Sequence, residues 1–302
     1  MKKMSIKSAG LLALTAFIWG VAFVAQSAGM DYIGPFTFSC IRSLMGGIVL
    51  IPCIRFLDKF NEKNAVPSKK PQTKEEKKTL LTGGLACGLA LCVASNLQQF
   101  GIQYTTAGKA GFITALYIVL VPIFGLFLKK KVSAKIWVSV AIAVAGLYFL
   151  CITGDLNINA GDFYVFLCAI VFTIHIMIID HFAPMVDGVR MSCIQFFVTG
   201  ILSAIPMFLF ESPDINAVIN ALIPLLYAGI LSSGVAYTLQ IVGQKDADPT
   251  MASLILSLES VFSVLAGWIL LKEVLTARET MGCILMFAAI ILSQLPEKAA
   301  KK

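Results

Sequence analysis

Long apolar stretches separated by short polar segments dominate this sequence. Each stretch holds about 20 residues with few charges, the length that an α-helix needs to cross the roughly 30 Å hydrocarbon core of a bilayer. We expect ten such helices, over Gly10–Ala28, Pro35–Phe56, Leu80–Tyr104, Thr106–Leu128, Ser133–Cys151, Gly161–Ile179, Val189–Phe210, Ile219–Val242, Pro249–Leu271 and Arg278–Leu295. The pattern therefore predicts an all-α integral membrane protein.

The composition agrees with a chain that lies mostly in lipid. Of its 302 residues, 58% are hydrophobic and only 14% are charged, and the mean hydropathy is +0.86. A soluble globular protein has about 45–50% apolar and about 25% charged residues. These values exclude a water-soluble fold.

The basic residues predict how the chain sits in the membrane. A net charge of +7 is also found in nucleic-acid-binding proteins, but here position matters more than number. With the N-terminus inside, 20 of the 24 Lys and Arg residues face the cytoplasm, three in each tail and 14 in loops. Because cytoplasmic segments carry the excess of Lys and Arg, we expect a multi-pass protein of the cell membrane with both termini cytoplasmic. Its partners would be the lipid bilayer and a small-molecule substrate, not nucleic acid.

Two segments of the sequence each occur a second time, in a similar form. SCIRSLMGG at 39–47 and SCIQFFVTG at 192–200 share an opening Ser-Cys-Ile and a closing Gly at a separation of 153 residues. LQQFG at 97–101 and LQIVG at 239–243 match in the same way at a separation of 142. The separations differ by 11 residues, and the polar loop between the second and third helices is 11 residues longer than its counterpart.

The repeat divides the chain into two units of five helices. We predict a first repeat, an external linker, a second repeat and a cytoplasmic tail, at residues 8–151, 152–160, 161–296 and 297–302. Because five is odd, the second repeat must enter the membrane from the opposite side. The loop after its second helix carries Glu211 and Asp214 with no Lys or Arg, whereas the loop of the first repeat carries eight. Inverted repeats allow a central site to open to each side in turn.

Several motifs resemble one transporter family. They are FIWGVAFV in the first helix, the early Arg42 of the second, TTAGKAGFI and LVPIF in the fourth, and LESVFSVLAGWILLKEVLT in the ninth. Together they resemble the EamA branch of the drug/metabolite transporter superfamily, although Ser260 and Lys272 replace the Pro and Gly that are common there. The resemblance implies a secondary transporter with ten helices that exports small metabolites, such as amino acids or drug-like compounds.

Three ionisable residues lie within predicted helices, where a charge is costly and usually faces a cavity or a partner. Arg42 would bind an anionic substrate group, or else extend to the outer interface or brace the bundle. Glu259 would bind a proton or a substrate amine, or else make a structural contact. His175 would relay protons or pack as a neutral ring. Glu259 and His175 are thus the candidates for proton coupling.

Uncharged polar and aromatic residues complete the candidate substrate path. Asn96, Gln98, Gln99 and Gln240 would suit a zwitterionic or neutral polar substrate, and of these only Gln98 and Gln240 occupy equivalent positions in the two repeats. Tyr237 would line the same path on the stripe of Gln240, and Trp19 and Tyr117 would flank it. The alternative for the amides is hydrogen bonding between helices, and for the aromatic rings it is packing.

Two other functions remain open from the sequence. A nucleotide-sugar or other anionic-metabolite exchanger of the same superfamily would need more basic residues along the path than Arg42 and Lys109. An intramembrane enzyme is a remote alternative, because HExxH is absent and Ser233 is followed by no histidine. We expect no catalytic residues, no cofactor and no metal site.

Overall fold

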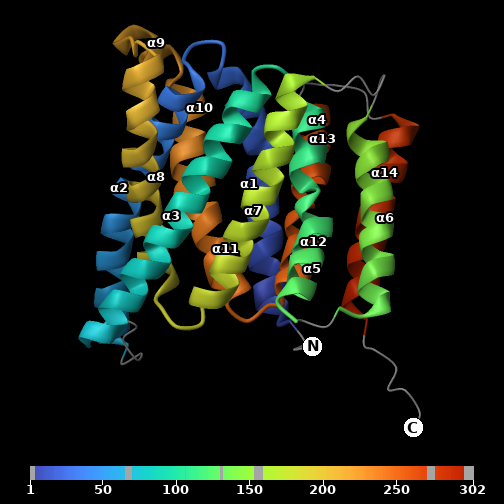
Figure 1. The fold of residues 1–302 in the computed structure, drawn as a ribbon, viewed down its shortest axis with the longest axis horizontal. Coiled ribbons are helices and arrows are strands. Elements are labelled where there is room, and N and C mark those ends of the chain that lie inside the picture. Colours follow the sequence, from blue (N-terminus) through green and yellow to red (C-terminus); the bar gives the residue numbers. More distant parts are fainter. Residues whose placement is uncertain are drawn as a thin grey trace.

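The structure is a computed structural model that describes residues 4–64, 70–105, 107–129, 132–152, 159–270 and 276–295. All regular secondary structure within these ranges is helical, and the long helices run side by side as a bundle (Figure 1). The first half holds α1 (Ile6–Gly29), α2 (Pro35–Lys63), α3 (Lys74–Ile102), α4 (Ala107–Ala115), α5 (Tyr117–Phe127) and α6 (Ala134–Cys151). The second half holds α7 (Ala160–Phe182), α8 (Gly188–Phe210), α9 (Ile215–Asn220), α10 (Leu222–Leu226), the π-helix η1 (Tyr227–Tyr237), α11 (Thr238–Gln244), α12 (Pro249–Leu256), α13 (Glu259–Leu270) and α14 (Ala277–Gln294).

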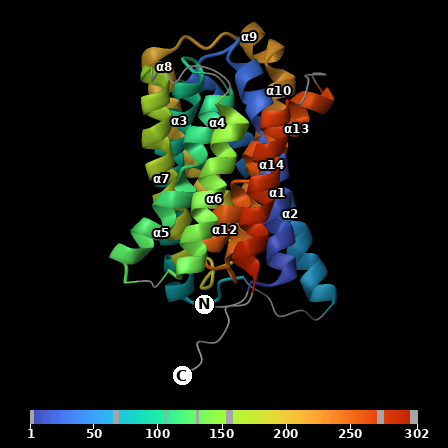
Figure 2. The same cartoon turned by 90° about the vertical axis from the view of Figure 1, so that its right-hand side faces the viewer.

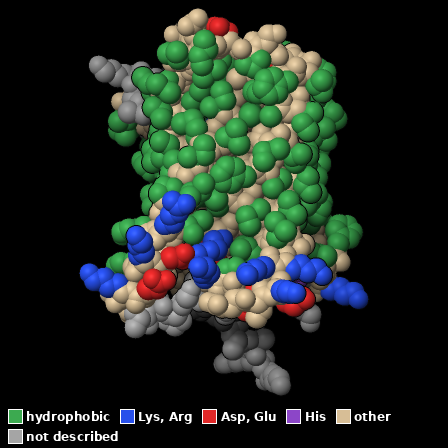
Figure 3. All heavy atoms as spheres, turned by 90° about the vertical axis from the view of Figure 1, so that its left-hand side faces the viewer, with side chains coloured by type: hydrophobic (Ala, Val, Ile, Leu, Met, Phe, Trp, Pro, Cys, Tyr) green, Lys and Arg blue, Asp and Glu red, His purple; other side chains and the backbone are tan. Residues whose placement is uncertain are grey.

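Eight helical segments of the described chain are long and apolar enough to cross a membrane. They are α1, α2, α3, α7, α8 and the runs Ala110–Phe127, Leu222–Gln244 and Pro249–Ala266. Large apolar side chains such as Ile48, Phe208 and Ile284 are exposed on the outside of the bundle. Figure 3 shows this apolar belt, with Lys and Arg gathered below it. The predicted all-helical membrane fold is confirmed at this level.

Helix ends follow local capping signals that the apolar pattern does not contain. α3 begins at a capping box made by Thr73 and Glu76, six residues before the predicted start at Leu80. α2 continues seven residues past Phe56, to Lys63. A capping box satisfies the first free backbone N–H groups of a helix, so a helix can start in water before its apolar part begins. The predicted ends Thr106 and Leu271 lie outside the described residues.

The predicted fourth and ninth helices are interrupted, contrary to the continuous spans expected above. α4 ends at Ala115 and α5 starts at Tyr117, with Leu116 N–H bonded to the Ile113 carbonyl at 3.2 Å. α12 and α13 are separated by Ser257 and Leu258 in the same way, with Leu258 N–H bonded three residues back at 3.1 Å. These tighter 3₁₀-type bonds replace α-helical ones at equivalent points of the two halves, 142 residues apart.

The predicted eighth helix is not a regular α-helix in its middle. Its central 11 residues form the π-helix η1, between α10 and α11. π-helices are rare, usually arise from an inserted residue, and are often found at functional sites.

α2 and α8 pack against each other as an antiparallel pair. Near one end, the Phe36 and Thr37 N–H groups at the start of α2 donate to the Glu211 carboxylate that follows α8. Near the other end, Arg190 at the start of α8 pairs with Asp58 of α2 at 2.6 Å. Both ends of the pair are therefore joined by a carboxylate.

The contacts within this pair are reciprocal. A Cβ on Gly47 would lie 3.2 Å from the Phe197 ring, and a Cβ on Gly200 would lie 2.6 Å from the Leu44 side chain. Gly47 and Gly200 are 153 residues apart, as are Leu44 and Phe197. The same contact thus occurs twice, with the roles of the two halves exchanged.

α6 and α14 form a second antiparallel pair at the opposite end of the bundle (Figures 1 and 2). They approach most closely at Gly146 and Gly282, where an added Cβ would lie within 3.0 Å of the facing backbone carbonyl. Lys135 at the start of α6 donates to the Leu295 carbonyl that follows α14, and Arg278 at the start of α14 lies over the Tyr148 ring near the end of α6. Helices from the two halves are therefore paired at both edges of the molecule.

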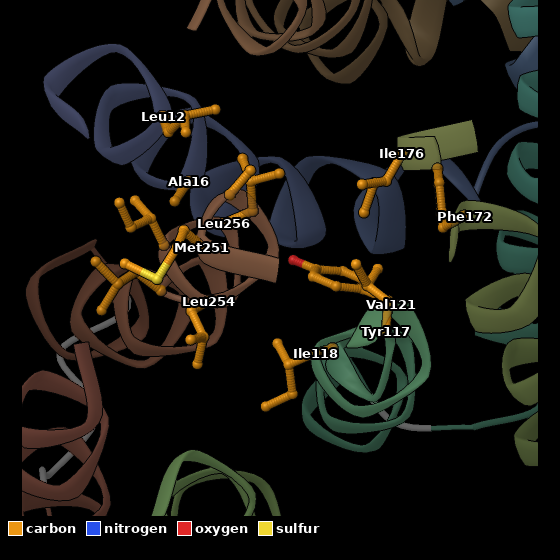
Figure 4. Close-up of a cluster of buried hydrophobic side chains, with 14 of the residues drawn as sticks. Leu12, Ala16, Tyr117, Ile118, Val121, Phe172, Ile176, Met251, Leu254 and Leu256 are labelled. Atoms are coloured by element: carbon orange, nitrogen blue, oxygen red, sulfur yellow. The ribbon is translucent and has the colours of Figure 1, made fainter. Parts of the chain in front are cut away.

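The central helices between these pairs bury the largest apolar cluster. Figure 4 shows part of it, where side chains of α1, α5, α7 and α12 meet. Tyr117 projects into this group from α5, with its hydroxyl directed away from its own helix.

Candidate functional site

A small cavity with a volume of about 30 Å³ lies among the central helices. Fourteen residues line it, seven from each half of the chain. They come from α1, α2, α3, α4 and α5 in the first half and from α7, η1, α11, α12 and α13 in the second. This volume has room for about one or two water molecules.

Most of the lining consists of equivalent positions from the two repeats. Trp19 and Phe172, and likewise Phe23 and Ile176, are 153 residues apart. Gln98 and Gln240, Thr114 and Leu256, and Tyr117 and Glu259 are each 142 residues apart. The separations are those of the repeated sequence segments, so the cavity is built on the relation between the two halves.

The charged residues do not follow this relation. Arg42 lines the cavity, but its equivalent in the second half is Gln195. Glu259 lines the cavity, and its equivalent in the first half is Tyr117. The cavity therefore carries a basic group from one repeat and an acidic group from the other.

Arg42 is 3% exposed and its Nη1 donates to the Gln26 side-chain oxygen at 3.1 Å. Its Nε has no partner in the described part of the chain. The alternative in which Arg42 extends to the outer interface is wrong, because the guanidinium is held inside by the amide of α1. The side chain lines the cavity and also joins α2 to α1, so anion binding and bracing of the bundle both stay open as its role.

Glu259 is the first residue of α13 and is 4% exposed. Its Oε1 accepts a hydrogen bond of 3.0 Å from the Tyr117 hydroxyl. Glu259 and Arg42 form no ion pair with each other within the described residues, although both interact electrostatically with Tyr237 and Cys168. The cavity thus holds a basic and an acidic side chain that are not in direct contact.

Uncharged groups extend the polar lining. Gln98 donates to the Thr114 hydroxyl at 3.2 Å, while the Gln240 side-chain oxygen and the Trp19 indole N–H have no partner among the described residues. The Trp19 and Tyr237 rings lie 4.6 Å apart. Unsatisfied buried groups cost free energy unless a water or a ligand binds them, which suits a site that receives a polar molecule.

Three predicted site residues do not line the cavity. Asn96 donates to the Ser203 hydroxyl at 2.8 Å, and Gln99 donates to the Gln26 carbonyl at 3.3 Å. His175 is fully buried and its Nε2 lies 3.1 Å from the Gln195 side-chain oxygen. These contacts join neighbouring helices and match the interhelical role named as the alternative for the amides.

Sequence reasoning missed seven of the lining residues. Phe23, Gln26, Thr114, Phe172, Ile176, Ser232 and Leu256 were not among the predicted site residues. Most are apolar or small and carry no chemical signal in a membrane helix. One of them could have been found from the repeat, because a step of 153 residues from the predicted Trp19 leads to Phe172.

Comparison with known proteins assigns the chain to a family. The sequence profile of the EamA-like transporter family matches it twice, over residues 6–152 and 159–295. The chain belongs to the EamA-like transporter family. The resemblance seen in its motifs is thereby confirmed, and the chain is a multi-pass membrane protein of the transporter class.

Relatives and a solved structure extend over most of its length. A transporter of Archaeoglobus fulgidus, named only as uncharacterized, is 32% identical over 94% of this chain and 84% of its own. The Bacillus subtilis transporter YoaV, also named as uncharacterized, is 23% identical over 94% and 95%. A WAT1-related chloroplastic protein of Arabidopsis thaliana is 24% identical over 93% and 68%. One crystal structure has a TM-score of 0.73 at 19% identity over 96% of this chain and 97% of its own, which shows a shared fold.

Proposed function

We propose that this chain is a secondary active transporter that exports small metabolites by alternating access. Its ten transmembrane helices form two inverted repeats, at 8–151 and 161–296, joined by an external linker at 152–160. Both tails, including 297–302, lie in the cytoplasm of a cell whose plasma or inner membrane holds the protein. The family supports transport in general, and the packing of equivalent helices and the cavity lining support the finer statements.

The count of ten rests on two helices beyond the eight apolar segments. α6 contains the shorter apolar helix Ala134–Leu150, and α14 carries Arg278 and Glu279 in its first turn. The two helices pack along each other and present apolar side chains such as Val138 and Ile284 to the outside. A lipid-facing antiparallel pair of this length favours two further spans.

The inversion is supported by how equivalent helices meet. α2 and α8 are equivalent by the repeat and run antiparallel, as do α6 and α14. Gly101 contacts Val165 of α7, and Gly243 contacts Leu12 of α1, which is the same contact with the two halves exchanged. An arrangement related by a two-fold axis in the membrane plane gives these features, and it is the arrangement that allows alternating access around a central site.

The single observation that carries the function is the composition of the cavity. Positions that the repeat makes equivalent line it from both halves, while Arg42 and Glu259 make its two sides chemically unequal. A substrate with separate anionic and cationic groups fits such a site, because Arg pairs well with a carboxylate and a buried carboxylate pairs well with an ammonium group. We therefore infer that amino acids are the substrate class.

The nucleotide-sugar alternative has less support. The described lining contains one basic side chain, which suits one carboxylate rather than a diphosphate, and the Lys109 side chain lies outside the described residues. Glu259 in the same cavity would repel a polyanion.

The test is a metabolite release screen followed by reconstitution. Cells that overproduce the chain are compared with cells that lack it, and amino acids that accumulate outside are measured by mass spectrometry. The purified protein in proteoliposomes should then exchange the released amino acid across the bilayer. Release of no amino acid, together with release of a phosphorylated metabolite, would reject the amino-acid assignment in favour of the exchanger.

A further inference from the structure

One hydrogen bond joins the two interrupted helices at their breaks. Tyr117 is the first residue of α5 and Glu259 is the first residue of α13, and the phenol donates to the carboxyl at 3.0 Å. The two side chains are 3% and 4% exposed. Since these positions are equivalent in the two repeats, the bond links the halves of the molecule at matching points of the cavity wall.

The chemistry of this bond is unusual for a buried acid. The titratable or charged groups that face Glu259 are Tyr117 on α5, Tyr237 on η1, Cys168 on α7 and Arg42 on α2. Arg42 makes no ion pair with it in the described part of the chain, so the bonded partner is a neutral phenol. A cationic donor forms a stronger bond with a carboxylate than a neutral one. An ammonium group that entered the cavity would therefore replace the phenol.

We propose that Tyr117 is a positioning residue that holds the Glu259 carboxyl in the empty cavity and releases it to the ammonium group of the substrate. This inference rests on the proposed function, since it takes an amino acid as the incoming ligand. The bond ties α5 to α13, so its replacement by a substrate contact also removes a link between the two interrupted helices. Substrate binding then acts on the relative position of the helices through a differential contact, as a population shift requires.

The first experiment needs no knowledge of the substrate. N,N′-dicyclohexylcarbodiimide is an apolar reagent that modifies protonated carboxyl groups inside membrane proteins, and its attachment to the Glu259 peptide can be followed by mass spectrometry. At one fixed neutral pH, Tyr117→Phe should be labelled several-fold faster than the wild type, because the carboxyl has lost its donor. Glu259→Gln should show no label on this peptide.

The matched control is Tyr227→Phe. Tyr227 lies on η1 outside the cavity, and its hydroxyl donates to the Ile18 carbonyl at 3.0 Å. This variant loses one phenol oxygen as Tyr117→Phe does, and it should be labelled at the wild-type rate. Equal rates for Tyr117→Phe and the wild type would overturn the proposal, as would an equal acceleration in Tyr227→Phe.

The second experiment measures transport. In counterflow with the amino acid released in the screen, Tyr117→Phe should lower KM about tenfold, equivalent to about 1.4 kcal/mol, without raising kcat. A loss of packing alone would not lower KM, so this split separates positioning from a structural role. An unchanged or higher KM in Tyr117→Phe would reject the competition between phenol and substrate.

The two experiments fail in different ways. If the wild type moves no amino acid, the proposed function is wrong, and the labelling comparison still decides whether Tyr117 controls Glu259. If the wild type moves an amino acid but both readouts of Tyr117→Phe match it, the function stands and this inference falls. Thermal unfolding in detergent confirms that each variant is folded, which the loss of one oxygen should permit.

Discussion

At the scale of single residues, two buried ionisable side chains make the cavity unequal. Arg42 and Glu259 occupy positions whose equivalents are the neutral Gln195 and Tyr117. A buried charge without a direct ionic partner is costly, and the cost is offset when a ligand supplies the opposite charge. We therefore expect both residues to act on substrate binding more than on folding, and this can be tested one residue at a time.

Glu259→Gln should abolish the pH dependence of transport in proteoliposomes, because the carboxyl that would carry the proton is gone while its shape remains. His175→Gln is the matched comparison, since His175 contacts Gln195 and does not line the cavity. This variant should keep the pH dependence. If Glu259→Gln keeps it and His175→Gln loses it, the proton route runs through α7 and α8 instead.

Arg42→Gln places in the first repeat the residue that the second repeat already has. A hydrogen bond to a charged group is worth about 1.5–3 kcal/mol, so KM for the exported amino acid should rise about tenfold or more. The amine that corresponds to the same amino acid without its carboxyl group should show little change. Comparable KM increases for both compounds would show that Arg42 braces the cavity and does not bind the carboxylate.

At the scale of helices, we expect the two carboxylates at the ends of the α2 and α8 pair to contribute unequally to stability. Glu211 accepts from the Phe36 and Thr37 N–H groups at 2.9 and 2.8 Å and from the Thr37 hydroxyl at 2.6 Å. Asp58, which is 153 residues earlier, instead forms a partly exposed salt bridge with Arg190. One carboxylate caps free backbone groups, whereas the other pairs with a side chain that water can also solvate.

Glu211→Ala should therefore destabilise the protein more than Asp58→Asn. Loss of a helix cap costs about 1–2 kcal/mol, while a partly exposed ion pair contributes about 1 kcal/mol or less. Thermal unfolding in detergent measures the difference, with the exposed Glu62→Ala as the reference variant. A larger loss for Asp58→Asn would mean that the ion pair, and not the cap, fixes the pair of helices.

The helices also show which features a sequence can predict. Apolar length predicted where the long helices lie, and the capping box at Thr73 starts α3 six residues before its predicted start. The breaks at Leu116 and at Ser257 and Leu258 were missed because no Gly or Pro marks them within a continuous apolar run. Tertiary contacts across the cavity, including the bond between the first residues of α5 and α13, accompany these breaks and have no local signal.

The place of the π-helix is related to the spacing between equivalent residues of the two repeats. Gly88 and Gly229 make matching close approaches, to the carbonyls of Gln195 and Arg42, and are 141 residues apart. Beyond η1 the separation is 142, as for Gln98 and Gln240. One extra residue therefore enters between these points, and a π-helix absorbs such an insertion without shifting the flanking faces.

At the scale of the whole molecule, the same helix-to-helix contacts occur in both halves, but the side chains that line the cavity differ. The reciprocal glycine contacts keep equivalent helices at equivalent distances, as the proposed alternating access requires. Residues that line the cavity differ from their equivalents in the other half, as Arg42 differs from Gln195 and Tyr117 from Glu259.

The proposed inversion makes a prediction about equivalent loops. Green fluorescent protein, which folds in the cytoplasm, should fluoresce when fused to either tail, and alkaline phosphatase, which is active only outside, should be inactive there. The loop after α2 and the loop after α8 are equivalent by the repeat, yet an inverted second half places them on opposite sides. Phosphatase fused after Asn64 should be inactive and phosphatase fused after Asp214 should be active.

Equal activity at both loops would mean that the repeats run parallel, and tails on opposite sides would mean an odd number of spans. Either result would remove the two-fold axis on which alternating access depends.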